Sequence, residues 1–254
     1  MLNKNLIVAN LKINYYESAN FNNNEPLVFL HGWGAEASSL KSIFFNLNNY
    51  LAIDLPGFGK SEIPKEAWGL TDYSDFLKLF LEKLAINNPI LIGHSFGGSI
   101  IIKYTSRGGL AKKIILIDSA GIRERGGRVR IYYYAAKIFK LFFLIPGLHL
   151  AKDYIRKLFY QAIDSSDYIE AGELTETYKK IISEDLSHDL KKIKTKTALI
   201  WGEDDKDTLL AHALKMQKLI SGAKLEVLKN AGHLPFLDQP ENFNKIFFNL
   251  LNAD

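Results

Sequence analysis

The stretch PILIGHSFGGSIIIKY, residues 89–104, decides how this chain is expected to fold. Its first part, Pro89–Ile92, is apolar and rich in β-branched residues, which is typical of a buried strand. Gly98–Tyr104 follows the helical repeat, so the turn between the two segments joins a strand to a helix. Ser95 stands at the centre of this turn, with a glycine two residues to either side. A serine held on such a turn is strained and faces the positive end of the helix, which favours a nucleophilic role.

Working outward from this stretch, short runs rich in Ile, Val and Leu alternate with helical patterns. This alternation predicts an α/β fold built on a mostly parallel β-sheet flanked by helices. The predicted strands are Leu11–Glu17, Leu27–Leu30, Leu51–Ile53, Ile90–Ile92, Lys113–Ile117, Ala198–Trp201 and Leu225–Leu228. Most of them are apolar throughout, as expected of strands covered on both faces. The first alternates more clearly, so we expect it to pair antiparallel at an edge of the sheet.

The alternation stops between Gly121 and about Leu190, where helical periods dominate and Gly and Pro interrupt the pattern. We interpret residues 121–190 as a mostly helical cap, or lid, inserted after the sixth core strand. Residues 1–120 and 191–254 are expected to form the α/β core together.

A second glycine-rich turn, His31-Gly32-Trp33-Gly34, follows the predicted strand Leu27–Leu30. Backbone N–H groups in such a turn can point at a reacting carbonyl oxygen. The N–H of Trp33, together with that of Phe96 directly after Ser95, would form an oxyanion hole. A tight turn around a buried tryptophan explains the motif equally well.

Two further segments offer the remaining groups of a catalytic triad. His233 lies in the loop after the last predicted strand, from which it can reach the neighbouring turn as a general base. The segment Trp201–Asp207 follows the preceding strand and contains three aspartates, Asp204, Asp205 and Asp207. A carboxylate is needed to hold the histidine tautomer, and the residues alone do not say which aspartate supplies it.

Together these residues resemble the α/β-hydrolase family, in particular its small single-domain esterases and carbon–carbon-bond hydrolases. The resemblance covers nearly the whole chain and includes the order serine, acid, histidine. In the family the acid usually stands three residues after the glycine of the Trp-Gly pair, a position that Asp205 occupies. Some relatives place it after the preceding core strand, where this chain has Asp118. The proline that often follows the acid is absent, since Asp207-Thr208-Leu209 stands there.

The residues and the resemblance predict a serine hydrolase of carboxylesterase type. Ser95 would attack a carbonyl carbon, His233 would accept its proton, and Asp205 would orient His233. Water activated by the same histidine would then hydrolyse the acyl-enzyme, so we expect no cofactor and no metal. Since His233 must be neutral to act as the base, kcat/KM should rise between about pH 6 and 7.5. The expected partner is a small ester-type substrate.

Two other functions stay open. Hydrolysis of a carbon–carbon bond in a dienoic diketone would use the same serine. A non-catalytic ligand-binding module would have the same fold without hydrolase activity. Ser95 argues against haloalkane dehalogenases and epoxide hydrolases, which resemble this chain but carry an aspartate at the same turn.

The composition argues against several classes of protein. The 254 residues are 47% hydrophobic and 24% charged, and they include no cysteine, which removes disulfides and thiolate sites. The N-terminus has neither a long apolar run nor a cleavage site, so we expect a cytoplasmic protein. No histidine has a partner at metal-binding spacing, and a net charge of +4 is too small to indicate nucleic acid.

The positive charge is concentrated in the predicted cap. Residues 121–160 contain nine Lys and Arg against two acidic residues, a net charge of +7, while the rest of the chain carries −3. Lys137 and Lys140 share one helix face, and apolar residues lie on another. We expect this segment to close the pocket, with docking on an anionic membrane surface as the less favoured alternative. The sequence does not indicate the oligomeric state or the size of the substrate.

Overall fold

The computed structural model describes residues 1–45, 47–123 and 171–252. The segment 124–170 lies outside the described residues. It contains most of the predicted cap, including Lys137 and Lys140, so the proposed lid and its membrane alternative stay predictions.

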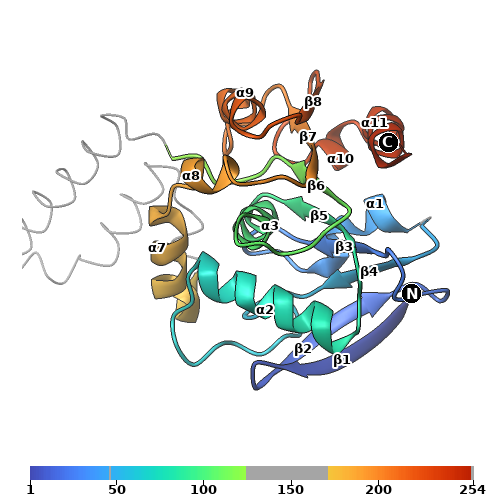
Figure 1. The fold of residues 1–254 in the computed structure, drawn as a ribbon, viewed down its shortest axis with the longest axis vertical. Helices are drawn as coiled ribbons and strands as arrows, with labels where there is room; N and C mark the ends of the chain where they lie inside the picture. Colours follow the sequence, from blue (N-terminus) through green and yellow to red (C-terminus); the bar gives the residue numbers. More distant parts are fainter. Residues whose placement is uncertain (46, 124–170, 253–254) are drawn as a thin grey trace, which may run out of the picture.

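A single sheet of eight strands forms the centre of the molecule, in the order β1-β2-β4-β3-β5-β6-β7-β8 (Figure 1). The strands are β1 (Leu2–Val8), β2 (Leu11–Glu17), β3 (Leu27–Leu30), β4 (Tyr50–Ile53), β5 (Ile90–His94), β6 (Lys113–Ile117), β7 (Lys196–Gly202) and β8 (Lys224–Leu228). From β4 to β8 every neighbouring pair is parallel, whereas β2 pairs antiparallel with both of its neighbours, β1 and β4. The predicted α/β class with a mostly parallel sheet is confirmed.

The N-terminal edge differs from the prediction. Residues Leu2–Val8 form β1, which pairs with β2 along its whole length, although the sequence pattern indicated no strand there. Nearly all of β1 is exposed, so it carries no clear apolar face that a pattern could reveal. The strand β2 does pair antiparallel, but it lies between β1 and β4 and not at the edge. With β1 counted, Lys113–Ile117 is the sixth strand.

Helices cover both faces of the sheet (Figure 1). One face packs against α2 (Leu70–Lys83), α3 (Phe96–Ser106) and α9 (Leu210–Leu219), and the other against α1 (Lys41–Phe44) and α11 (Pro240–Asn252). Alternate residues of β6 serve the two sides: Ile114 and Leu116 join the first core, and Ile115 and Ile117 the second. Each fully buried side chain of this kind stabilises the fold by about 1.5–3 kcal/mol.

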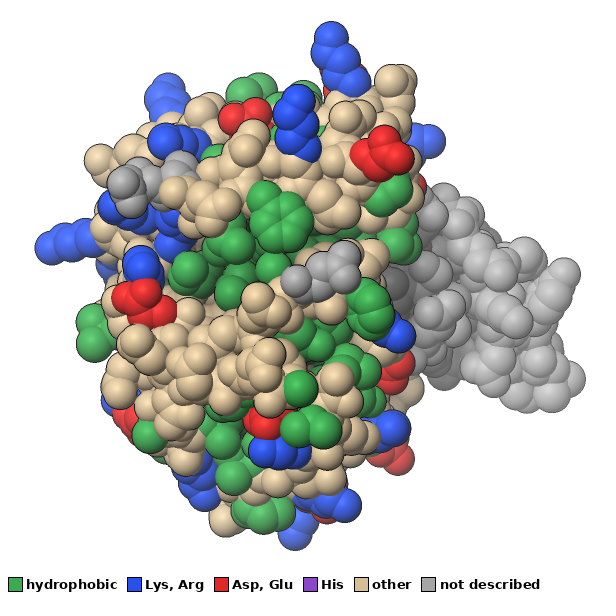
Figure 2. All heavy atoms as spheres, turned by 90° about the vertical axis from the view of Figure 1, so that its right-hand side faces the viewer, with side chains coloured by type: hydrophobic (Ala, Val, Ile, Leu, Met, Phe, Trp, Pro, Cys, Tyr) green, Lys and Arg blue, Asp and Glu red, His purple; other side chains and the backbone are tan. Residues whose placement is uncertain are grey.

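The second face is seen in Figure 2, which views the molecule from the side of α1 and α11. Hydrophobic side chains lie between the projecting lysine, arginine and acidic groups of this face. Phe45 after α1 and Phe248 on α11 are among the exposed large hydrophobic residues of the chain.

The described end of the predicted cap is helical. Between β6 and β7 the chain forms η3 (Gly172–Leu174), α7 (Thr175–Ser183) and α8 (Ser187–Leu190). The helix α7 is held to the core, since Thr177 Oγ1 accepts a hydrogen bond of 3.0 Å from the backbone N–H of Trp68. None of the described helices is long and apolar enough to cross a membrane.

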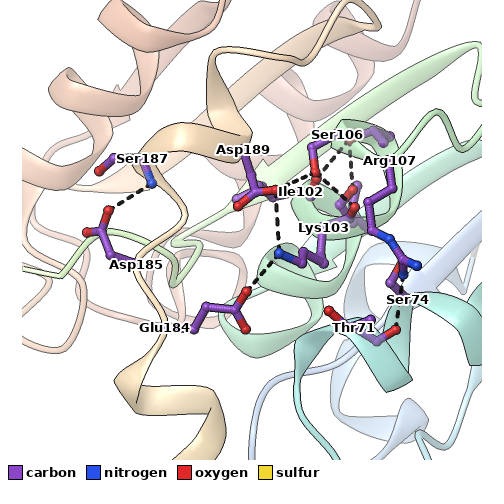
Figure 3. Close-up of polar contacts among 12 residues, drawn as sticks. Thr71, Ser74, Ile102, Lys103, Ser106, Arg107, Glu184, Asp185, Ser187 and Asp189 are labelled. Carbon is purple, nitrogen blue, oxygen red and sulfur yellow. Dashed lines mark hydrogen bonds and ion pairs between the residues drawn. The ribbon is translucent and has the colours of Figure 1, made fainter.

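Polar contacts tie α3 to the segment that returns from the predicted cap (Figure 3). Lys103 Nζ lies 2.8 Å from Glu184 and 3.5 Å from Asp189, and Ser106 Oγ donates to Asp189 at 2.9 Å. The Lys103 side chain is only 14% exposed, so these ion pairs are screened less than pairs on the surface. They brace α3, the helix that follows Ser95.

Candidate active site

Ser95 occupies the strand-to-helix turn that the sequence predicted, between β5 and α3. Its backbone has φ +48° and ψ −112°, a conformation that L-residues rarely adopt. Surrounding hydrogen bonds hold it there: its N–H donates to Ile117 O at 3.0 Å, and its carbonyl accepts from Gly98 and Ala120. Such strain persists only where neighbouring structure imposes it, and it is concentrated at functional sites.

The glycines around Ser95 are required by the close approach of the backbone. A Cβ atom on Gly97 would lie 2.3 Å from Leu30 O, and one on Gly93 would lie 2.6 Å from Gly97 C. Since both obstructions are backbone atoms, neither can move aside without shifting β3 or α3.

We expect Gly97→Ala to destabilise the fold by about 2 kcal/mol or more, because the added methyl group overlaps Leu30 of a central strand. Urea unfolding followed by circular dichroism measures this change. Gly69→Ala is the matched control, since a Cβ there would find its nearest atom at 3.9 Å. Equal unfolding midpoints for the two variants would contradict the close packing of the turn.

The His31–Gly34 turn follows β3 and lies against the turn of Ser95. A Cβ on Gly32 would be 3.4 Å from Ser95 Cβ and 3.0 Å from His94 Nδ1. His31 is internally bonded: its Nε2 accepts from the Leu55 N–H at 3.0 Å, and its Nδ1–H donates to Gly32 O at 2.7 Å. Burial lowers the pKa of His31 to about 4, so this neutral histidine shapes the turn.

The two predicted oxyanion donors lie on these adjacent turns. Within the described part of the chain, the backbone N–H groups of Trp33 and Phe96 have no hydrogen-bond acceptor. Phe96 is the first residue of α3, where an N–H has no partner inside the helix. The Trp33 ring packs 5.4 Å from that of Phe96 and 4.9 Å from that of Tyr178 on α7. Both N–H groups are therefore available to a bound oxygen.

His233 and Asp205 are brought together from loops after β8 and β7. His233 Nδ1 lies 2.9 Å from Asp205 Oδ2. Asp205 also accepts hydrogen bonds from Asp207 N at 2.8 Å, Thr208 N at 3.0 Å and Thr208 Oγ1 at 2.6 Å. Burial acts to raise the pKa of the Asp205 carboxyl, but the bonds from His233 and Thr208 outweigh it and hold the pKa below its usual value. Asp205 is therefore ionised, and Nε2 of His233 is left to accept a proton.

The other candidate acids have different surroundings. Asp204 and Asp207 are exposed, whereas Asp118 is fully buried after β6. Asp118 Oδ1 accepts the Gly202 N–H at 2.9 Å, and one of its oxygens lies within 4.8 Å of ligand atoms of Asp205 and His233. Burial is the main cause that raises the pKa of Asp118 to about 10. The carboxylate hydrogen-bonded to His233 is that of Asp205.

His94 takes part in this arrangement in a way that the sequence did not indicate. Its Nε2–H donates to the backbone carbonyl of His233 at 2.8 Å, and the two rings lie 4.8 Å apart. Burial lowers the pKa of His94 to about 3, so it is a neutral donor. His94 thus links the strand before Ser95 to the loop of His233. These residues are 139 positions apart, and no local sequence pattern predicts such a bond.

Asp118, Asp205 and His233 are also spaced closely enough to hold a cation. Their hydrogen bonds are instead those of a histidine oriented by a carboxylate. His233 and Asp205 are bonded to each other, and burial favours the protonated form of Asp118, whereas metal ligands must be deprotonated.

The model of the alpha/beta hydrolase family matches residues 27–246, a span from β3 into α11. The chain belongs to this family. The AB hydrolase superfamily protein YisY of Bacillus subtilis is 26% identical, over 90% of this chain and 92% of its own length. The 2-hydroxy-6-oxo-6-phenylhexa-2,4-dienoate hydrolase of Burkholderia cepacia is also 26% identical, over 89% of this chain and 87% of its own.

Solved structures of alpha/beta hydrolases share the fold. An esterase from Exiguobacterium antarcticum is 23% identical with a TM-score of 0.76, covering 99% of this chain and 100% of its own. The meta-cleavage product hydrolase CumD from Pseudomonas fluorescens is 20% identical with a TM-score of 0.72, covering 98% and 97%. The resemblance drawn from the sequence is therefore confirmed for the family and the fold.

A cavity of about 390 Å³ lies between the Trp33 turn and the returning segment 171–174. Its walls are mainly apolar side chains and glycines, among them Trp33, Phe58, Ile63 and Leu174. Trp33 belongs to the turn that lies against Ser95, and the apolar part of this cavity suits an uncharged organic group.

Proposed function

We propose that this alpha/beta hydrolase is a serine hydrolase that cleaves an ester or a related carbonyl bond. The observation that carries the proposal is the hydrogen bond between His233 and Asp205, together with the strained turn of Ser95, whose preceding residue His94 is bonded to the His233 carbonyl. A buried carboxylate on Nδ1 fixes the tautomer whose Nε2 can take a proton from a serine hydroxyl. The three groups come from loops at the carboxyl ends of β5, β7 and β8, where open α/β sheets bind their ligands.

In the proposed mechanism Ser95 Oγ attacks the carbonyl carbon as His233 Nε2 accepts its proton. Asp205 stabilises the imidazolium that forms, and it stays ionised because its hydrogen bonds keep its pKa low. The leaving alcohol takes the proton from His233. A water molecule, activated by the same histidine, then attacks the acyl-enzyme and releases the acid.

The negative charge that develops on the carbonyl oxygen would be stabilised by the N–H groups of Trp33 and Phe96. Both lack another acceptor among the described residues, and the second sits at the positive end of α3. Donors fixed in advance in this way cost no reorganisation during the reaction.

Carbon–carbon-bond hydrolysis is the second candidate. The relative from Burkholderia cepacia, and one of the same name from Comamonas testosteroni at 24% identity, are dienoate hydrolases. The same triad and cavity would serve that reaction, with a carbon acid as the leaving group in place of an alcohol.

We expect turnover of short p-nitrophenyl esters, with kcat/KM at least about tenfold above that for a dienoic ring-cleavage diketone. Release of nitrophenol and loss of the dienolate absorbance measure the two reactions on the same preparation. A series of acyl chains from acetyl to decanoyl then maps the cavity beside Trp33. A preference for the diketone would select the second candidate, and no turnover of either class would favour a non-catalytic binding module.

A further inference from the structure

Asp118 has no part in the mechanism described so far, although it is buried beside the proposed triad. It follows β6 with φ +40°, so the turn after that strand is strained as well. The backbone is anchored by a hydrogen bond from the Asp118 N–H to Ile200 O at 3.0 Å. One carboxyl oxygen, Oδ1, accepts the Gly202 N–H at 2.9 Å. The structure thus holds this carboxyl group in a defined place against β7.

The second carboxyl oxygen is in an unusual position. Among the described residues, Asp118 Oδ2 has no N–H or O–H group that donates to it, and it is fully buried. Its neighbour is the carboxyl group of Asp205, which is hydrogen-bonded to His233. Oxygens of the two carboxyl groups lie within 4.8 Å of each other, and two buried carboxylates this close repel each other unless one of them keeps a proton. A buried acceptor without a donor is costly, whereas a protonated oxygen becomes a donor.

We propose that Asp118 is a protonated carboxylic acid that donates a hydrogen bond to Asp205 and so positions it against His233. Asp118 is then a positioning residue: it acts on the proposed acid and touches neither the substrate nor Ser95. The inference deepens the proposed function and rests on it for its effect on turnover, while the protonation itself rests on the buried pair alone.

The charges around Asp118 agree with a retained proton. Burial is the main cause that raises its pKa; the bond from the Gly202 N–H acts to lower it, and the neighbouring carboxyl group of Asp205 raises it further. The carboxylates of Asp205 and of Asp238, on α10 (Pro235–Asp238), both disfavour a second negative charge there. Among the described residues, His233 is a neighbour that can become positive, and its Nδ1 is bonded to Asp205. With its pKa at about 10, Asp118 stays neutral throughout the range in which a histidine base works.

The first test compares Asp118→Asn with Asp118→Ala. An asparagine has an oxygen for the Gly202 N–H and an N–H group for Asp205, so it reproduces both bonds of the protonated acid. Alanine removes both and leaves the Asp205 side unsupported. We expect the alanine variant to lose about tenfold or more in the rate at which a fluorophosphonate labels Ser95. The asparagine variant should recover most of that rate. If Asp118→Asn is as slow as Asp205→Asn, Asp118 acts as a charged acid and the proposal is wrong.

The second test needs no activity, so its failure is separate from that of the proposed function. In the folded state Asp118 would keep its proton, whereas in the unfolded chain it loses the proton above about pH 4. The free energy of unfolding of the wild type should therefore fall as the pH rises toward 10. Asparagine does not titrate. The Tm of Asp118→Asn minus that of the wild type should therefore grow by about 5 °C or more between pH 5 and pH 8.

Asp204→Asn is the control for this series, because Asp204 is exposed, and its Tm difference should stay constant. Infrared spectra at pH 7 give an independent readout. The carbonyl band of a protonated carboxylic acid should be present in the wild type and in Asp204→Asn and absent in Asp118→Asn. A constant Tm difference for Asp118→Asn, or a wild type without this band, would overturn the proposal.

Discussion

Replacing Ser95 by alanine is expected to lower ester turnover by about three decades or more while leaving the fold intact. The loss follows because no other group in the proposed site can form the acyl-enzyme. The fold should survive, since alanine adds no atom and meets the same backbone strain at φ +48° as serine does. Initial rates with a p-nitrophenyl ester, together with thermal unfolding of both proteins, measure the two halves of this prediction.

Ser99 provides the matched control for this experiment. It lies one turn further along α3 and is buried, but the proposed mechanism gives its hydroxyl no role. Ser99→Ala should keep most of the activity, and a fluorophosphonate should label the wild type and Ser99→Ala but not Ser95→Ala. Turnover that persists in a pure sample of Ser95→Ala would contradict the assignment of Ser95 as the nucleophile.

Asp205→Asn is expected to cost about three to four decades in kcat, the second largest effect that the site predicts. The amide can turn its N–H₂ group toward His233, which then no longer receives an ionised acceptor on Nδ1. The imidazolium that forms during attack also loses its counter-charge. Steady-state kinetics with the same ester measure the loss, and circular dichroism checks that the variant is folded.

Asp204→Asn and Asp207→Asn are the controls, since both side chains are exposed and neither holds His233. Each should stay within about threefold of the wild type, as is usual for surface changes away from a site. The backbone N–H of Asp207 that supports Asp205 is unaffected by the substitution. If Asp204→Asn or Asp207→Asn lost orders of magnitude in kcat while Asp205→Asn did not, the assignment of Asp205 would be wrong.

The sequence by itself determined the class of fold and the strand-to-helix turn that holds Ser95, the proposed nucleophile. Both depend on local patterns: an apolar run before Gly93, a helical repeat after Gly98, and turns rich in glycine. Strands buried on both faces are recognisable because every residue is apolar, as in β5 and β6. The strand β1 was missed for the opposite reason. Its residues are mostly exposed and mixed, and it becomes a strand only because β2 offers a free edge.

Only the tertiary structure decided how the acidic residues differ. Four aspartates stand after β6 and β7, and a sequence assigns all of them the same chemistry. In the fold, Asp205 receives four hydrogen bonds and is charged, Asp118 is buried against it, and Asp204 and Asp207 face water. The hydrogen bond from His94 to the His233 carbonyl also depends on the tertiary structure, because it joins residues 139 positions apart in the chain. Burial and hydrogen-bond partners decide the charge of a carboxyl group, and both are properties of the packed molecule.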